Sequence, residues 1–79
     1  MLEEYINNYI NKKIIITGNE DDMILSCNIR YDLNKENELF QPISYQAIAK
    51  RLLINKSVRK RILKGSMHYI GIRYKEINE

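Results

Sequence analysis

The sequence predicts a small α+β domain in which a short antiparallel sheet packs against a pair of helices. Apolar residues recur at helical spacing at the N-terminus and again after Ser44, whereas β-branched and alternating runs lie between these segments and near the C-terminus. The chain has 79 residues, which is below the usual size of a domain, so a single domain over residues 1–79 is expected. The expected order of elements is αββααβ.

The first expected element is a helix at the N-terminus. Five apolar side chains occupy positions i, i+3, i+4, i+7 and i+8 and therefore share one stripe: Leu2, Tyr5, Ile6, Tyr9 and Ile10. An apolar stripe must pack against a partner. That partner is either the core of the domain or a second copy of the chain in a homodimer.

Two strands joined in a hairpin are expected next. Residues 13–17 form a β-branched run that ends at Gly18, and residues 23–31 alternate between apolar and polar side chains. The apolar positions are Met23, Leu25, Cys27, Ile29 and Tyr31, and the opposite face carries Ser26, Asn28, Arg30 and Asp32. One face of this sheet is therefore expected to be covered and the other to face water.

A loop and a helix are expected after the hairpin. Residues 33–42 lack a period and end in a proline, so they are interpreted as a loop. Ser44 is a suitable N-cap for a helix over residues 45–53. The buried stripe of this helix is expected to consist of Tyr45, Ile48, Ala49 and Leu52.

A second helix and a closing strand complete the expected fold. Asn55 is a suitable cap for a helix over residues 56–64, and Gly65 is a suitable residue to end it. Residues 67–75 are rich in β-formers and predict a strand. Its inward side chains are expected to be Ile70, Ile72 and Tyr74.

Charge is divided unequally between the two halves of the chain. Residues 1–40 contain four Lys and Arg against eight Asp and Glu, a net charge of −4, whereas residues 41–79 contain nine against two, a net charge of +7. A basic half of this kind is typical of a protein that binds a polyanion. The acidic half is compatible with a protein partner.

The sequence offers little material for catalysis or for metal binding. The single histidine, His68, has no acidic neighbour that would orient it as a general base, and Cys27 is expected to be a buried, inert thiol. One cysteine and one histidine do not form a metal cluster, and Glu20-Asp21-Asp22 lacks the ligand spacing of a calcium loop. We therefore expect no enzyme activity, no metal and no cofactor.

The segment 44–65 is the most informative part of the sequence. Two short helices joined by a turn predict a helix-turn-helix-like unit whose second helix has an apolar side and a basic side. The basic residues and their neighbours give the expected nucleic-acid-binding set: Lys50, Arg51, Lys56, Ser57, Arg59, Lys60, Arg61 and Lys64. The alternative is an ordinary amphipathic helix with a solvated basic side.

This segment also resembles a known family. The run Ser44-Tyr45-Gln46-Ala47-Ile48-Ala49-Lys50-Arg51-Leu52-Leu53-Ile54-Asn55-Lys56-Ser57-Val58-Arg59-Lys60-Arg61-Ile62-Leu63-Lys64, followed by Tyr69-Ile70-Gly71-Ile72-Arg73-Tyr74, is similar to the NUMOD-type helix-turn-helix modules repeated in intron-encoded homing nucleases. The resemblance covers about half of the chain and implies DNA contact by the second helix. It implies no nuclease activity, because the chain contains no nuclease domain.

Two functions are compatible with these observations. The first is a small, non-catalytic protein that binds double-stranded DNA, of phage or plasmid regulatory or accessory type, in which a homodimer would suit paired half-sites. The second is a phage-encoded inhibitor that binds a host protein, namely a nucleic-acid enzyme, as an anti-defence factor. The single cysteine is typical of the reducing cytoplasm, and no run of residues is long and apolar enough to span a membrane.

Overall fold

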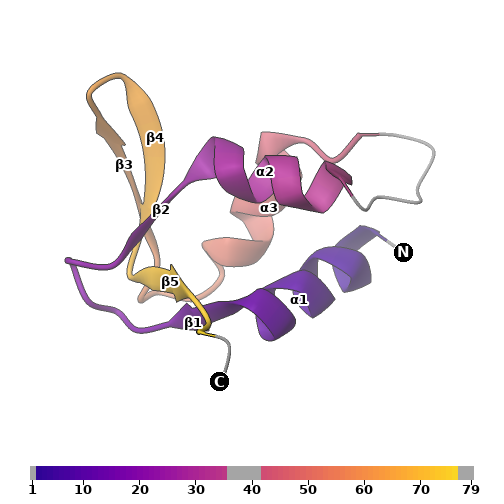
Figure 1. Ribbon diagram of the computed structural model, residues 1–79, viewed down its shortest axis with the longest axis horizontal. Coiled ribbons are helices and arrows are strands. Elements are labelled where there is room, and N and C mark those ends of the chain that lie inside the picture. The colour runs from indigo at the N-terminus through magenta and orange to yellow at the C-terminus, as the bar shows by residue number, and fades with distance from the viewer. Residues whose placement is uncertain (1, 36–41, 77–79) are drawn as a thin grey trace.

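The computed structural model describes residues 2–35 and 42–76 and contains three helices and five strands (Figure 1). The elements are α1 (Leu2–Lys13), β1 (Ile14–Ile16), β2 (Met23–Leu25), α2 (Ser26–Lys35), α3 (Tyr45–Leu52), β3 (Arg59–Leu63), β4 (Ser66–Ile70) and β5 (Ile72–Tyr74). The α+β class is therefore confirmed.

The strands form two small antiparallel sheets. One contains β2, β4 and β3, with β4 in the middle, and the other contains β1 and β5. In Figure 1 the β3–β4 hairpin projects at one end of the molecule, and the three helices lie together on the other side. The helices cover one face of the three-stranded sheet near its base and leave the tip of the hairpin uncovered.

The core lies between the helices and the two sheets. Its fully buried side chains include Ile6 of α1, Ile29 of α2, Ile48 of α3 and Ile72 of β5. Ile6 belongs to the stripe expected on the first helix, and Tyr5, Tyr9 and Ile10 pack against the core beside it. The expected helix is therefore confirmed, and four of the five stripe residues pack within the chain, whereas Leu2 is 39% exposed.

The backbone crosses itself closely at Gly71, the residue between β4 and β5. The Gly71 N–H donates to the carbonyl of Asp22 at 2.8 Å, and the Gly71 carbonyl accepts from the N–H groups of Thr17 and Gly18 at 2.8 and 3.0 Å. Gly71 has a φ of 93°, and a Cβ there would lie 2.3 Å from the carbonyl oxygen of Ser57. Four segments of the chain therefore meet at a point where only glycine fits.

The second expected strand is a helix for most of its length. Only Met23–Leu25 is extended, and Ser26–Lys35 forms α2, with Ser26, Ile29 and Leu33 buried on one side. The expectation of a strand over residues 23–31 was wrong because the apolar residues there fit a helical period as well as an alternating one. Cys27 and Tyr31, which a strand would place on the same face as Ile29, are exposed. Of the loop expected over residues 33–42, residues 33–35 belong to α2, and residues 36–41 lie outside the described part of the chain.

The expected second helix over residues 56–64 is absent, and with it the helix-turn-helix pair. The chain leaves α3 through turns, runs as β3 and returns as β4. Lys64 and Gly65, with φ values of 53° and 80°, occupy the two positions between the strands, as a type I′ hairpin turn requires. Gly65 was interpreted as a helix end because a glycine with positive φ suits that position equally.

The strand partners also differ from those expected. No hairpin joins residues 13–17 to residues 23–31, since β1 pairs with β5 and β2 pairs with β4. The expected closing strand is divided at Gly71, and Ile70 and Ile72 are buried whereas Tyr74 is 38% exposed. The observed order is αββααβββ, which begins with the same six letters as the expected order, but α2 was not expected and the helix expected over residues 56–64 is absent.

We expect Gly71→Ala to destabilise the protein by about 3 kcal/mol or more, because it combines a positive φ with a clash against backbone. Gly65→Ala is the matched control: Gly65 also has a positive φ, but nothing lies within 4 Å of its Cβ position. This control should cost only about 1 kcal/mol. Urea unfolding of both variants measures the difference, and equal losses would contradict the role given to Gly71.

Three tyrosines that are wholly or partly removed from water predict a loss of stability in alkaline solution. Tyr9 of α1 donates to Oδ2 of Asp32 in α2 at 3.1 Å. Burial, followed by the nearby charges of Tyr74 and Asp32, raises the pKa of Tyr9 well above its ordinary value of 10.0, and burial also raises the pKa of Tyr69 and of Tyr74. The unfolded chain releases these protons first, so the free energy of unfolding should fall as the pH rises above 10.0.

Tyr9→Phe removes one of these protons and tests the assignment. Urea unfolding between about pH 9 and pH 11 should show a smaller decrease in unfolding free energy with pH for Tyr9→Phe than for the unchanged protein. At neutral pH the variant should lose about 1 kcal/mol through the missing hydrogen bond. An unchanged alkaline slope would show that Tyr9 ionises as readily in the folded protein as in the unfolded chain.

Candidate nucleic-acid interface

The β3–β4 hairpin presents a run of cations on an edge strand. Among the strands of the described residues, β3 pairs with β4 alone, and none of them lies on its other edge. Arg59, Lys60 and Arg61 follow one another along it, and all three are exposed, as is Lys64 in the turn. Successive side chains of a strand point to opposite faces, so Lys60 projects on one face of the hairpin and Arg59 and Arg61 on the other.

α3 begins at the expected N-cap and buries part of its expected apolar stripe. The Oγ of Ser44 accepts a hydrogen bond from the N–H of Ala47 at 3.1 Å, so the predicted N-cap is confirmed. Ile48 and Leu52 are buried as expected. Tyr45 was expected in the same buried stripe, but its side chain is 45% exposed because it lies at the first turn, beyond the edge of the core.

Two of the predicted site residues are engaged in ion pairs. Arg51 is half-buried, donates to Oδ1 of Asn7 at 3.1 Å and lies 3.7 Å from a carboxylate oxygen of Glu3. Arg59 is 3.2 Å from a carboxylate oxygen of Glu20. Arg51 therefore holds α3 against α1, whereas the pair at Arg59 is exposed and weak enough to exchange with another anion.

The remaining predicted site residues fall into two groups. Lys60, Arg61 and Lys64 lie on the hairpin, and Lys50 and Lys56 lie on α3 and in the turns that follow it. Within residues 2–35 and 42–76 none of these five makes an ion pair. The exposed Ser57 donates its N–H to Oδ1 of Asn55 at 2.9 Å and contributes mainly to the crossing at Gly71.

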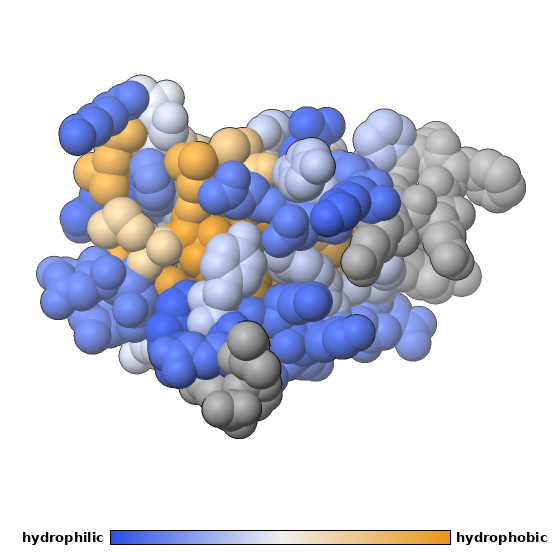
Figure 2. Space-filling view, in the orientation of Figure 1, coloured by the Kyte–Doolittle hydropathy of each residue, from blue (hydrophilic) through white to orange (hydrophobic). Residues whose placement is uncertain are grey.

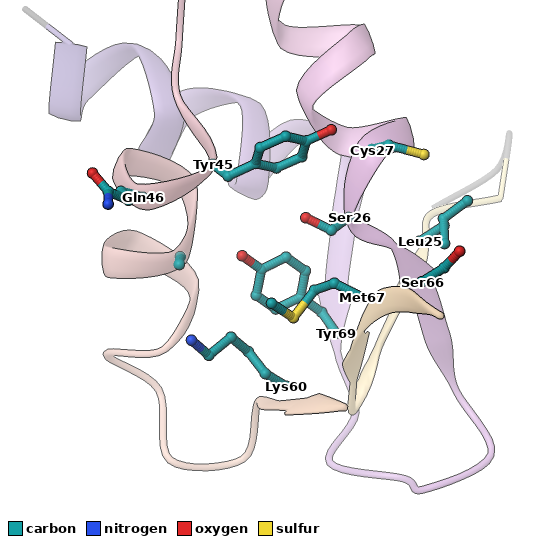
Figure 3. A pocket seen from close by; sticks show the side chains of 10 residues that line it. Leu25, Ser26, Cys27, Tyr45, Gln46, Lys60, Ser66, Met67 and Tyr69 are labelled. Carbon is teal, nitrogen blue, oxygen red and sulfur yellow. The ribbon is translucent and has the colours of Figure 1, made fainter. Parts of the chain in front are cut away.

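A cavity of about 420 Å³ lies between the hairpin and α3. Figure 3 shows its lining, which comes from β2, α2, α3, β3 and β4: Leu25, Ser26, Cys27, Tyr45, Gln46, Ala49, Lys60, Ser66, Met67 and Tyr69. In Figure 2 apolar side chains gather at the hairpin end of the molecule with hydrophilic ones around them. The cavity is therefore apolar inside and polar at its margin.

A second cavity of about 500 Å³ adjoins the first. Its lining is Cys27, Arg30, Tyr31, Asn34, Lys35 and Tyr45, so the two cavities share Cys27 and Tyr45. The guanidinium of Arg30 lies 4.7 Å from the centroid of the Tyr45 ring, and its Nε donates to the carbonyl of Ile43 at 3.0 Å. Sequence reasoning missed Arg30, Tyr31 and Lys35 as site residues because it did not recognise α2, and the spacing from Leu25 to Leu33 fits a strand as well as a helix.

The residues considered for catalysis lie apart from one another. His68 is half-buried on β4 with Nδ1 3.0 Å from the carbonyl of Ser66. The expectation of a buried Cys27 was wrong: its thiol is exposed, because α2 turns it out of the core. Asp22 accepts from the hydroxyl of Thr17 at 2.7 Å within the turn before β2. In the described part of the chain no group of acidic, histidine and cysteine side chains is arranged to hold a metal ion.

Comparison with known proteins adds no assignment. The chain matches no protein-family model, and no curated protein or solved structure is significantly similar to it. The NUMOD-type resemblance therefore gains no support. Among residues 2–35 and 42–76 no helix has both the length and the apolar character that crossing a bilayer requires.

The position of Cys27 predicts ready alkylation of the folded protein. Because Cys27 is exposed and is the single cysteine of the chain, iodoacetamide should modify it within about tenfold of the rate of an unfolded thiol. Mass spectrometry over a time course, with and without urea, measures the ratio. Strong protection in the absence of urea would place the thiol in the core instead.

Proposed function

We propose that this chain is a small nucleic-acid-binding protein, of regulatory or accessory type, that contacts double-stranded DNA with the β3–β4 hairpin. The observation that carries this proposal is the projecting two-stranded ribbon with Arg59, Lys60 and Arg61 in succession on its edge strand. The major groove of DNA admits a two-stranded ribbon as well as a helix. The proposal therefore does not need the recognition helix that the sequence predicted.

The free cations supply the contacts. Arg61 and Lys64 are exposed at the outer part of the hairpin, where they can reach phosphates, and an arginine can also donate to O6 and N7 of a guanine. Lys50 and Lys56, near the base of the hairpin, extend the basic surface toward α3. Because these side chains make no ion pair within the described residues, DNA binding would displace water and counterions but no protein partner.

The same charges oppose pairing of β3 with a second copy. An unpaired edge strand normally risks association with other strands, and lysines on the edge are a common protection. In an antiparallel β3–β3 pair, Arg59, Lys60 and Arg61 would face the same three residues, which is destabilising. The exposed cations are therefore better matched to a polyanion than to the chain itself.

The alternative, an inhibitor that offers its acidic half to a host protein, has less support. Its acidic residues are dispersed over α1 and the turn before β2. Glu3 and Glu20 are engaged by Arg51 and Arg59, respectively. Partial neutralisation of this kind weakens any acidic surface that would compete for a nucleic-acid channel.

Charge reversal on the hairpin tests the proposal. Lys60→Glu/Arg61→Glu should weaken binding to a random duplex by about tenfold or more and lower the slope of log K against log salt by about 2, since each phosphate contact contributes about 0.9. Fluorescence anisotropy across a salt series measures both. The matched control is Lys12→Glu/Lys13→Glu, on exposed lysines at the end of α1, away from the hairpin tip.

The two double substitutions, one on the hairpin and one on α1, change the net charge equally. The comparison therefore separates the effect of a local contact from a general effect of charge on DNA affinity. The proposal requires the hairpin pair to lose much more affinity than the α1 pair. Equal losses, or a duplex affinity that does not respond to salt, would remove the hairpin from DNA binding.

A further inference from the structure

The two cavities share Cys27 and Tyr45 in their linings, and we name their combined surface the Tyr45 groove. Its lining consists of Leu25, Ser26, Cys27, Arg30, Tyr31, Asn34, Lys35, Tyr45, Gln46, Ala49, Lys60, Ser66, Met67 and Tyr69. Tyr45 and Cys27 lie where the cavities meet. Figure 3 shows the part of this surface that lies between the hairpin and the start of α3, and the second cavity extends its lining along α2 to Lys35.

Aromatic rings and apolar side chains supply its inner surface. Tyr69 is 1% exposed and lies behind the half-buried Met67, whereas Tyr45 and Tyr31 are 45% and 67% exposed. Arg30 lines the second cavity only, so the Tyr45 ring is supported by a cation on that side and borders the first cavity on the other. Because Nε of Arg30 is also bonded to the carbonyl of Ile43, this support is fixed before any ligand arrives.

Cations stand along the groove. Lys60 lies beside the first cavity, and Arg30 and Lys35 lie beside the second. Of the described residues that line the groove, none carries a carboxylate. A ligand that complements this surface combines negative charge with flat, apolar rings.

We propose that the Tyr45 groove binds an unpaired stretch of nucleic acid, with a base against the Tyr45 ring and the flanking phosphates near Lys60 and Lys35. Proteins that bind single strands combine a basic groove with aromatic platforms on which bases stack. The proposal rests on the nucleic-acid function proposed above and adds a second mode of contact to it. The duplex is held by the hairpin edge, and a single strand, at an end or a gap, is held in the groove.

A polypeptide is the main competing ligand. An acidic peptide would match the three cations. Without aromatic side chains of its own, it would make no stacking contact with the Tyr45 ring that lies against the Arg30 guanidinium. A strand of nucleic acid supplies a ring and a charge at every unit of its chain. The repeated pattern of exposed tyrosines and cations therefore favours the nucleic acid.

The test uses the full chain and two labelled strands of about twelve nucleotides, which is within the usual size of a single-strand site. One strand is oligothymidylate, and the other is an abasic strand that keeps the phosphates and lacks the bases. We expect oligothymidylate to bind at least fivefold more tightly and to slow the alkylation of Cys27, because Cys27 lines both cavities. Equal affinities, or unchanged alkylation of Cys27 at saturating oligothymidylate, would overturn the proposal.

Tyr45→Leu removes the ring and keeps an apolar side chain with good helix propensity. It should weaken binding of oligothymidylate at least fivefold and change the affinity for the abasic strand and for a blunt duplex less than twofold. Tyr74→Leu is the matched control, since Tyr74 is 38% exposed and lies outside the groove lining. Thermal unfolding checks that both variants fold.

The outcomes separate this inference from the proposed function. If the hairpin variant loses duplex binding but oligothymidylate and the abasic strand bind with equal affinity, the proposed duplex function is retained and the groove proposal is overturned. A salt-insensitive duplex affinity together with Tyr45-dependent binding of oligothymidylate would do the reverse. Protection of Cys27 by polyglutamate, equal to that by oligothymidylate, would also overturn the groove as a site for bases.

Discussion

The close crossing of the backbone at Gly71 is the constraint on which the rest of the fold depends. It joins β4, the central strand of one sheet, to β5, the edge of the other, and it ties both to the chain before β2. The carbonyl of Ser57 lies against the same point. Because Ser57 precedes β3, this crossing also fixes where the hairpin leaves the body of the protein. The hairpin cations are therefore exposed because the base of the hairpin is held at this crossing.

The parts of the fold that could be predicted are those whose patterns are local. The apolar stripe of α1 consists of residues close together in sequence, and so does the cap of α3, in which Ser44 bonds the N–H of Ala47. The sequence alone therefore identifies both helices. α2 was missed because one set of apolar residues satisfied two periods. Leu25, Ile29 and Leu33 fit an alternating strand as well as a helix, and only the exposure of Cys27 and Tyr31 in the folded chain distinguishes them.

The hairpin could not be predicted from its own residues. Arg59, Lys60 and Arg61 have good helix propensity, and the turn glycine suits a helix end as well as a type I′ turn. Pairing of β3 with β4 decides the outcome, and such pairing overrides local propensity. The candidate site was consequently predicted as a list of cations but not as an arrangement. Tyr45 was assigned to the core, and Arg30 and Tyr31 to a strand, so the groove between them had no sequence signal.

The change from helix to strand alters which cations act together. On a helix Lys60, Arg61 and Lys64 would share one side and contact one ligand. On β3 neighbouring residues face opposite ways, so Lys60 borders the Tyr45 groove while Arg61 faces away from it. The two faces of the hairpin are therefore two separate basic surfaces with different neighbouring side chains. The outer face carries Arg59 and Arg61 beside Leu63 and His68, and the inner face carries Lys60 beside aromatic rings. Under the two proposals above, a single β-strand would supply one surface for a duplex and another for unpaired bases, so a chain of this size would need no second domain for the two modes of contact.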